Sequence, residues 1–334
     1  MWGIGIIGAG SYGEQHAQAL ASLTGVRLVA ASRTNAPALH AFTQTYGGTP
    51  YTDYHDLLRD ESVQVVMIAT PHHLHIEAAL AALHAGKNVL LEKPLAPNRQ
   101  ECDQIVQAVR EAGVKFMVGH VNHFVPAYQV AKQIIESGEM GEVVYGLATM
   151  QKYWMESNRR DWHLNRETGG GVWLTVGIHP LDRLTWLVDS PVTTVSAQFS
   201  TRFHPQQADD AGMVFLRYAN GAAGTIVSTG YHTGAPKHLT ELTCTRGMLN
   251  VDYTGGVTMG REEHWQTIPE SLPTGDWMHA ALVEEWRQFI QSIEQDTPSP
   301  VPADFAAHIM DVAFAAEQSS QEQHEIAIHA TWSP

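Results

Sequence analysis

The chain has 334 residues, of which 44% are hydrophobic, and this length and composition suit two domains with sizeable cores. Its 35 acidic residues outnumber its 20 basic ones, and the net charge of −15 argues against nucleic acid or an anionic membrane surface as a partner. No apolar run has membrane-spanning length, and the first one is short and lacks a basic region before it. Because the two cysteines, Cys102 and Cys244, match no metal or redox spacing, we expect a cytoplasmic protein with reduced thiols.

The chain opens with a short apolar run, Ile4 to Ile7, which leads into Gly-x-Gly-x-x-Gly and then a helical pattern. Strand, glycine turn and helix form the context that a dinucleotide-binding turn requires. The first glycine permits a tight turn, the second lets the backbone approach a pyrophosphate, and the third allows the helix to pack closely on the strand. The helix N-terminus adds N–H groups for the phosphates. We therefore predict cofactor contacts at Gly8, Ala9, Gly10, Ser11, Tyr12 and Gly13.

Strand and helix patterns alternate over residues 1–121, which predicts an α/β Rossmann domain with a doubly wound parallel sheet. Strands are expected at 4–7, 26–31, 63–69, 88–91 and 116–118, and helices at 14–22, 36–46, 75–85 and 98–112, the last with Asn98 as N-cap. Ligands of such sheets bind beyond the carboxyl ends of the strands. The glycine turn and three further segments follow such ends and should converge on one crevice: Ser32-Arg33, Thr70-Pro71-His72 and Glu92-Lys93-Pro94.

The residues after the second strand bear on the choice of cofactor. An acidic side chain there would bind the ribose 2′-hydroxyl of NAD, but this chain has Ser32 and Arg33. A guanidinium pairs with a 2′-phosphate and stacks on adenine. We therefore favour NADP, with NAD as the alternative.

Residues 122–334 predict a second α/β domain with a large, open and mostly antiparallel sheet. Helices are expected at 126–137, 278–294 and 303–321, and strands at 143–151, 193–201, 212–218, 223–228, 239–244 and 248–253. A glycine-led block runs from Gly169 to Arg183. If it is helical, Thr175, His179 and either Asp182 or Arg183 share one face through their i, i+3 and i+4 spacing.

The ordered motifs resemble the glucose–fructose oxidoreductase/inositol dehydrogenase family (Gfo/Idh/MocA). Besides the glycine turn and the His179 block, the resemblance rests on Thr70-Pro-His-His-Leu-His75, Ala85-Gly-Lys-Asn-Val-Leu-Leu-Glu-Lys-Pro94 and Gly138-Glu-Met-Gly-Glu-Val143. It implies a Rossmann domain followed by an α/β domain whose open sheet holds substrate on one face and forms oligomer contacts on the other. It also implies hydride transfer between NAD(P) and a hydroxyl-bearing carbon of a cyclic sugar, polyol or diol, in a homodimer or homotetramer formed through that sheet.

Carried over by position, the resemblance makes Lys93 the lysine that contacts the substrate hydroxyl and the nicotinamide ribose, where it would stabilise alkoxide charge. His179 matches the acid/base histidine, whose imidazole suits proton transfer near neutral pH. Asp182 matches an acidic residue that would orient that ring. The further cofactor contacts that the family implies are Thr70, Pro71, His72, His75 and Glu92.

Two departures from the family pattern matter. The family often carries Asp four residues before the histidine, where this chain has Thr175, so we expect a less basic His179. The family's Arg-Phe-x-x-Pro-like segment is replaced by Asn122-His123-Phe124-Val125-Pro126, and His120 and His123 add imidazoles. These changes argue against a standard inositol or glucose dehydrogenase and keep a non-catalytic NAD(P)-binding regulator as an alternative.

The segment from Lys152 to Arg166 is rich in aromatic and cationic residues. It is either a pocket wall, with rings stacked on a cyclic substrate and Arg159 or Arg160 forked onto a carboxylate, or a solvated loop with tryptophans docked on the sheet. The first interpretation favours a cis-dihydrodiol carboxylate dehydrogenase of aromatic-compound catabolism. Substrate contacts are then expected at His120, Tyr153, Arg159, Arg160, Trp162, Thr175, His179 and Asp182.

Two further expectations concern cofactors. The histidines at 72, 73 and 75 lack a completing set of carboxylates or cysteines, so no metal site is predicted. Within the enzyme class, redox-assisted elimination or glycoside cleavage with tightly held NAD stays open beside simple dehydrogenation.

Overall fold

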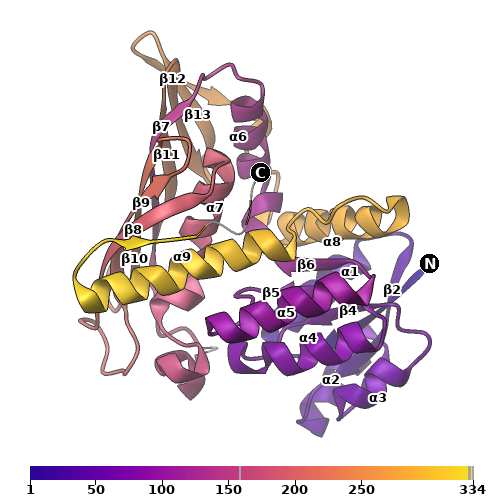
Figure 1. Cartoon of the computed structure of the whole chain (residues 1–334). Helices are drawn as coiled ribbons and strands as arrows, with labels where there is room; N and C mark the ends of the chain where they lie inside the picture. The colour runs from indigo at the N-terminus through magenta and orange to yellow at the C-terminus, as the bar shows by residue number, and fades with distance from the viewer. Residues whose placement is uncertain (158, 330–331, 333–334) are drawn as a thin grey trace. The chain divides into compact units, whose positions relative to one another are not determined.

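The computed structural model describes residues 1–157, 159–329 and 332, and the chain divides into two compact units (Figure 1). Unit 1 comprises Met1–Val121 and Met278–Ala307, and unit 2 comprises Asn122–Trp277 and the chain from His308 on. The sequence-based division at 121/122 therefore needs one correction, because 278–307 belong to unit 1. The reason is the apolar side of helix α8 (Trp277–Gln295), where Trp286 is fully buried and donates a hydrogen bond to His16 of unit 1. Residues 330–331 and 333–334 of the predicted second domain lie outside the described residues.

Unit 1 contains the predicted parallel sheet, with six strands in the order β3-β2-β1-β4-β5-β6. The strands are β1 (Trp2–Ile7), β2 (Val26–Ser32), β3 (Thr49–Tyr51), β4 (Val65–Ile68), β5 (Asn88–Glu92) and β6 (Phe116–Gly119). Every residue of β4 is buried, as expected for a parallel strand covered on both faces. The strand order reverses direction between β1 and β4, which is where such sheets bind nucleotides. The short β3 and α3 (Tyr54–Arg59) were not predicted, because three and six residues are too few to show a period.

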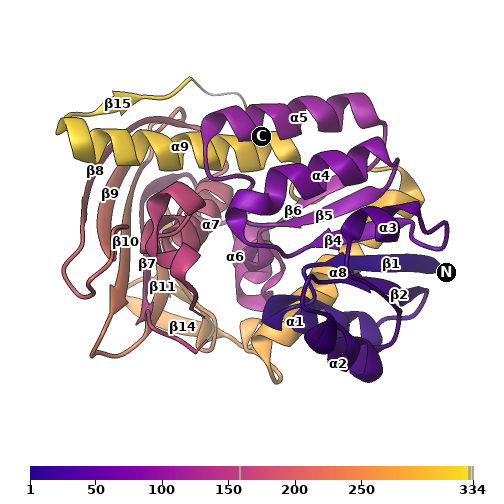
Figure 2. The same cartoon turned by 90° about the horizontal axis from the view of Figure 1, so that it is seen from below.

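Helices cover both faces of this sheet. In Figure 2, α4 (His75–His84) and α5 (Arg99–Ala112) lie on one side, and α1 (Ser11–Ala21), α2 (Ala36–Tyr46) and α8 lie on the other. The predicted cap of α5 is confirmed, since the side chain of Asn98 accepts a hydrogen bond from the Glu101 N–H and the helix ends at Gly113 with φ +65°.

Unit 2 is built on a nine-stranded sheet with the order β14-β13-β12-β11-β7-β10-β9-β8-β15. All neighbouring strands are antiparallel except β10 and β7, which confirms a mostly antiparallel sheet. The strands are β7 (Val143–Tyr153), β8 (Val192–Ser200), β9 (Ala211–Tyr218), β10 (Ala223–Tyr231), β11 (Lys237–Cys244), β12 (Gly247–Asp252), β13 (Gly256–Arg261), β14 (His264–Ile268) and β15 (Ile326–Ala327).

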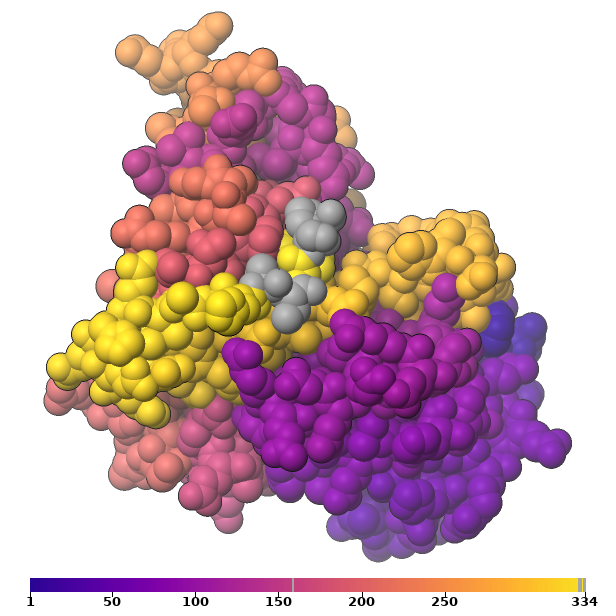
Figure 3. Space-filling model, in the orientation of Figure 1, coloured from indigo at the N-terminus to yellow at the C-terminus, as the bar shows by residue number. Residues whose placement is uncertain are grey.

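The helices of unit 2 lie on one side of this sheet. Figure 2 shows α6 (Pro126–Glu136), α7 (Ile178–Val188) and α9 (Ala303–Glu322) on that side, and Figure 3 shows α9 and the segment after it as a yellow ridge. The burial of β9 and β10 alternates along each strand, so their other side chains point to the face without helices. That face exposes large apolar side chains, namely Tyr145, Met213, Phe215, Met248 and Trp265. None of the described helices is long and apolar enough to cross a membrane.

Candidate functional site

The glycine turn after β1 has the geometry that a bound pyrophosphate requires. Gly8 has φ +95°, and a Cβ there would lie 2.5 Å from the Ala69 carbonyl oxygen. A Cβ on Gly13 would lie 2.6 Å from the Gly8 oxygen, so only glycine lets α1 pack this closely. A Cβ on Gly10 would meet no atom within 4 Å among the described residues, so the backbone there is open to a ligand. The turn and the N-terminus of α1 therefore fit a dinucleotide.

The four strand-end segments predicted to converge do lie together in unit 1. Gly8 and Ala9 donate backbone hydrogen bonds to the Ser32 carbonyl at 3.0 and 3.1 Å. Arg33 Nη1 donates to the Ala9 carbonyl at 3.1 Å, which places the guanidinium beside the glycine turn. His75 contacts the carbonyl oxygens of Thr70 and Pro94, so the ends of β4 and β5 meet at this ring. Lys93 lies in the same segment, and the Lys93–Pro94 peptide bond is cis.

Glu92 belongs to a buried network that the sequence analysis missed. Its Oε1 lies 3.0 Å from His16 Nε2, and Trp286 Nε1 donates to His16 Nδ1 at 3.0 Å. An indole N–H can only donate, so Nδ1 is an acceptor and the ring proton resides on Nε2, where it is donated to Glu92. The carboxylate of Glu92 therefore faces the interior of unit 1.

Glu285 on α8 completes this network. It is fully buried, and neither of its carboxyl oxygens has a hydrogen-bond partner among the described residues. Burial, together with the nearby Glu92 carboxylate, raises the pKa of Glu285 well above its usual range. One ligand atom from each of His16, Glu92 and Glu285 lies within 4.8 Å of the others, as around a metal ion. A metal on Nε2 would however leave the His16 ring without a proton on either nitrogen, so the Trp286 hydrogen bond disfavours a metal here.

In unit 2, His179 lies at the start of α7, directly after a π-helical turn (Trp173–Gly177) that contains Thr175. Asn122 Nδ2 lies 3.4 Å from both Nδ1 and the carbonyl oxygen of His179. An amide donor opposite Nδ1 favours the neutral ring with its proton on Nε2.

The orientation of Asn122 is set by a relay from Arg183. Arg183 is fully buried and donates from Nη1 to Tyr253 Oη at 2.6 Å. The Tyr253 hydroxyl in turn donates to Asn122 Oδ1 at 2.8 Å, which turns Nδ2 of Asn122 toward His179. Burial raises the pKa of Tyr253, so its proton is retained. Asn122, Arg183 and Tyr253 were not predicted as site residues, although the first two lie in segments that were singled out.

Asp182 has a close partner other than the one expected for it. Its Oδ1 lies 2.8 Å from His123 Nε2, and both side chains are buried. The His123 ring stacks on Trp186 at a centroid distance of 4.2 Å. His123 and Asp182 thus form a buried pair next to the His179 segment.

The cationic and aromatic side chains of the predicted pocket wall mostly contact neighbours within the same segment. Arg159 pairs with Glu156 at 2.8 Å, donates to the Trp154 carbonyl and stacks on the Trp154 ring. Arg160 Nη1 donates to two backbone carbonyls, and Trp162 stacks on His163 at 3.6 Å. Tyr153 ends β7 on the same face as exposed Tyr145. Asn158 lies outside the described residues.

The other predicted residues lie in unit 1. His120 is buried, with its ring edge against Phe305. His72 is buried and packs against His75, and Tyr12 packs edge-on against His16.

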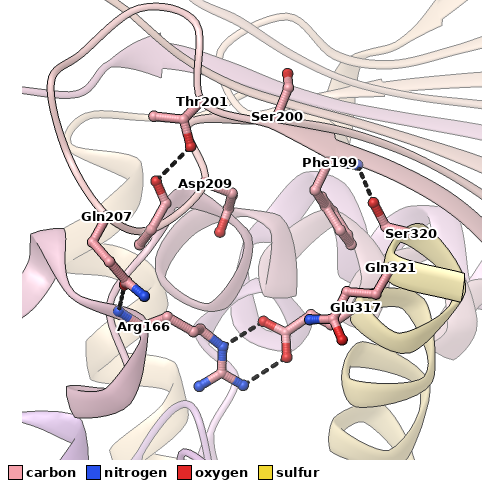
Figure 4. A pocket seen from close by; sticks show the side chains of 10 residues that line it. Arg166, Phe199, Ser200, Thr201, Gln207, Asp209, Glu317, Ser320 and Gln321 are labelled. Atoms are coloured by element: carbon pink, nitrogen blue, oxygen red, sulfur yellow. Dashed lines mark hydrogen bonds and ion pairs between the residues drawn. The ribbon is translucent and has the colours of Figure 1, made fainter.

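A pocket of about 460 Å³ lies in unit 2, between α9, the end of β8 and the segments around Arg166 and Asp209 (Figure 4). Arg166 forks onto Glu317 through two hydrogen bonds of 2.5 and 2.6 Å. Burial raises the pKa of Asp209 to about 7, although one of its oxygens accepts the Trp173 N–H. No predicted site residue lines this pocket, whose lining is Arg166, Phe199, Ser200, Thr201, Gln207, Ala208, Asp209, Glu317, Ser320 and Gln321.

Comparison with known proteins places both units among oxidoreductases. A family model described as "Oxidoreductase family, NAD-binding Rossmann fold" matches residues 2–120, and one described as "GFO/IDH/MocA C-terminal domain" matches residues 128–250. The 2,7-anhydro-N-acetylneuraminate hydratase of Mediterraneibacter gnavus is 30% identical over 277 residues, covering 79% of this chain and 71% of that protein.

Two other similarities bear on chemistry and fold. The 1-carboxy-3-chloro-3,4-dihydroxycyclohexa-1,5-diene dehydrogenase of Comamonas testosteroni is 32% identical over 207 residues, covering 62% of this chain and 52% of that protein. The structure of an NAD binding oxidoreductase from Klebsiella pneumoniae superposes with a TM-score of 0.88 at 26% identity, covering 98% of this chain and 99% of that one.

Proposed function

Because the chain belongs to the Gfo/Idh/MocA family of NAD-binding oxidoreductases, we propose that it transfers hydride between NADP or NAD and a hydroxyl-bearing carbon of a cyclic substrate. One observation carries the assignment of Lys93 to this reaction. Lys93 follows β5 at the carboxyl end of the sheet, which also carries the glycine turn, so an amino group lies at the nucleotide-binding end of unit 1.

The roles of the residues follow from the chemistry. Oxidation removes a hydride from the carbon and a proton from its hydroxyl oxygen, and bound nicotinamide supplies the hydride acceptor. In oxidation the neutral amine of Lys93 accepts the hydroxyl proton, and the ammonium that results stabilises the negative charge that develops on the oxygen. His179 is the second candidate for proton transfer, since it matches the acid/base histidine of the family, and its Nδ1 lies 3.4 Å from the Asn122 amide nitrogen. In the reducing direction the same groups polarise the carbonyl and Lys93 returns the proton.

The side chains near the aromatic segment favour an uncharged sugar or polyol as the substrate. The Arg159 side chain is 8% exposed and is paired with Glu156, so its guanidinium already has a carboxylate partner. The similarity to the Comamonas dehydrogenase supports a carboxylated dihydrodiol as the second candidate. The similarity to the Mediterraneibacter hydratase supports a third candidate, in which hydride is removed and returned within one reaction on an anhydrosugar.

The helix-free face of the unit 2 sheet supports a homo-oligomer. Its exposed apolar side chains extend from Met213 on β9 to Trp265 on β14. Contiguous apolar patches of this kind mark interaction surfaces. We propose that a second copy of the chain covers this face.

The test is turnover of purified protein with NADP and NAD against sugars, inositols, anhydrosugars and cis-dihydrodiol carboxylates, followed by nicotinamide absorbance and product analysis. We expect signal with one substrate class, and a loss of about 10²-fold or more for Lys93→Met and His179→Ala with cofactor binding retained. Product without net absorbance change would favour the hydratase-type reaction. Full activity of Lys93→Met would refute the proposed role of that residue, and cofactor binding without turnover across the panel would favour a regulator.

A further inference from the structure

The segment that carries Lys93 is held on both sides by buried histidines from different helices. Glu92, one residue before Lys93, accepts a hydrogen bond from His16 of α1 at 3.0 Å. Pro94, one residue after it, lies with its carbonyl oxygen 2.8 Å from Nδ1 of His75 at the start of α4. Both histidine side chains are 0% exposed, so water does not compete for these bonds.

The tautomer of His16 makes its bond to Glu92 directional. Trp286 donates to Nδ1, which leaves Nε2 as the donor toward the carboxylate. Tyr12 and Trp286 both pack edge-on against the ring and fix its plane. Burial and the Glu92 carboxylate raise the pKa of Glu285, which disfavours a second negative charge in this cluster.

His75 lies between two acceptors, the carbonyl oxygens of Thr70 and Pro94, at 3.0 and 2.8 Å. Burial lowers the pKa of His75 and favours the neutral ring, which can donate only one hydrogen bond. We assign the proton to Nδ1, because the contact with Pro94 is the shorter one. The charged groups that face the ring are Glu92 and Lys93, and their effects on its pKa oppose each other.

We propose that His16 and His75 are positioning residues that fix Lys93, the first through the Glu92 side chain and the second through the Pro94 carbonyl. This inference rests on the proposed function of Lys93. Fixing the residues on both sides of Lys93 holds the backbone from which its side chain reaches a reacting oxygen. A displacement of about 1 Å at such a group costs up to about 10²-fold in rate.

Asparagine and glutamine substitutions test the two hydrogen bonds of each histidine ring separately. Asparagine places its amide near the position of Nδ1, and glutamine near that of Nε2. His16→Gln can still donate to Glu92, whereas His16→Asn keeps only the contact with Trp286. His75→Asn can still donate to Pro94, whereas His75→Gln keeps only the contact with Thr70. The two members of each pair are equally polar and differ in which bond they preserve.

The experiment measures kcat, KM, cofactor Kd and melting temperature for the four variants, together with hydrogen exchange of the peptide around Lys93. Within each pair we expect kcat to be about 10- to 100-fold lower in His16→Asn than in His16→Gln, and in His75→Gln than in His75→Asn, with the cofactor Kd of the two members within about twofold of each other. Exchange around Lys93 should rise only in His16→Asn and His75→Gln, and this readout needs no substrate.

Equal kcat and equal exchange in both members of each pair would overturn the inference, as would losses that follow melting temperature or Kd instead of kcat. Lys93→Met separates the two proposals. If Lys93→Met stays active, the proposed function of Lys93 is refuted. If Lys93→Met is inactive but the two members of each histidine pair behave alike, only the positioning role is refuted. Should a His16 variant not fold, Trp286→Phe replaces it, and unchanged kcat and exchange in that variant would overturn the His16 half.

Discussion

The hydroxyl of Tyr253 donates to the side-chain oxygen of Asn122 at 2.8 Å, and this bond decides which end of Asn122 faces His179. Arg183 donates a hydrogen bond to the Tyr253 hydroxyl oxygen, so the hydroxyl proton of Tyr253 points toward Asn122. The amide nitrogen is thereby turned toward Nδ1 of His179, the position at which a carboxylate would instead stabilise the imidazolium.

Tyr253→Phe should change the pH dependence of catalysis as well as stability. The ring keeps its stacking on Trp277, but Asn122 can then turn its oxygen toward His179, which raises the pKa of that residue. The pH profile of kcat/KM should move to higher pH, and the free energy of unfolding should fall by about 1–3 kcal/mol because Arg183 loses a buried acceptor. Tyr128→Phe is the matched control, since its hydroxyl bonds to Thr240. Identical shifts in both variants would contradict the relay.

Thr175→Asp should restore the carboxylate that the family often carries at this position. A negative charge near His179 favours its protonated form, so the pKa of His179 should rise and the pH profile should shift upward by about one unit. Thr175→Asn has nearly the same shape without the charge and should leave the profile in place. Profiles that coincide for the two variants would show that Thr175 does not act on His179.

Glu285→Gln should stabilise the protein more as pH rises. The folded-state pKa of Glu285 is raised, so the folded chain holds a proton that the unfolded chain releases above about pH 4.5. Wild-type stability should therefore fall as pH rises from that value toward the folded pKa, by up to about 1.4 kcal/mol per pH unit, and glutamine removes this loss. Urea unfolding between pH 4.5 and pH 8 measures the difference. Glu284→Gln, which loses an ion pair with Arg287, is the control and should show no such gain. A pH-independent effect of Glu285→Gln would refute the raised folded-state pKa of Glu285.

Arg33→Ala should weaken NADP binding more than NAD binding. The guanidinium lies beside the glycine turn, where it can pair with a 2′-phosphate. We expect about a tenfold loss in NADP affinity, the scale of one charge-assisted hydrogen bond, and little change for NAD. Arg27→Ala, at an exposed position on β2, the strand that Arg33 follows, is the control for net charge. Equal losses for the two cofactors would remove the argument for NADP.

Tyr145→Glu should shift the protein toward monomer if a second copy covers the open face of the unit 2 sheet. Tyr145 lies on β7 and is 62% exposed, so the change costs the isolated chain little. Burying a carboxylate in an apolar interface is costly. Light scattering after size exclusion measures the assembly, with Gln104→Glu on α5 as the control. An unchanged assembly, or a wild-type monomer, would rule out this interface.

The sequence by itself determined the elements whose signals are local. The glycine spacing dictates the turn after β1, because only glycine tolerates the positive φ of Gly8 and the close approach at Gly13. Alternating apolar patterns located the Rossmann strands, and an N-cap residue located α5. The motifs around Lys93 and His179 also pointed to the family before any geometry was known.

Only the tertiary structure decided which groups surround those motifs. Trp286 reaches His16 across 270 residues, Tyr253 reaches Asn122 across 131, and no local period encodes either pairing. Asp182 illustrates the same limit, since the family resemblance related it to His179 alone and packing also brought His123 to 2.8 Å from it. The position of the His16 proton, the raised pKa of Glu285 and the assignment of α8 to unit 1 all depend on burial and hydrogen bonding between distant segments, which exist only once the chain has folded.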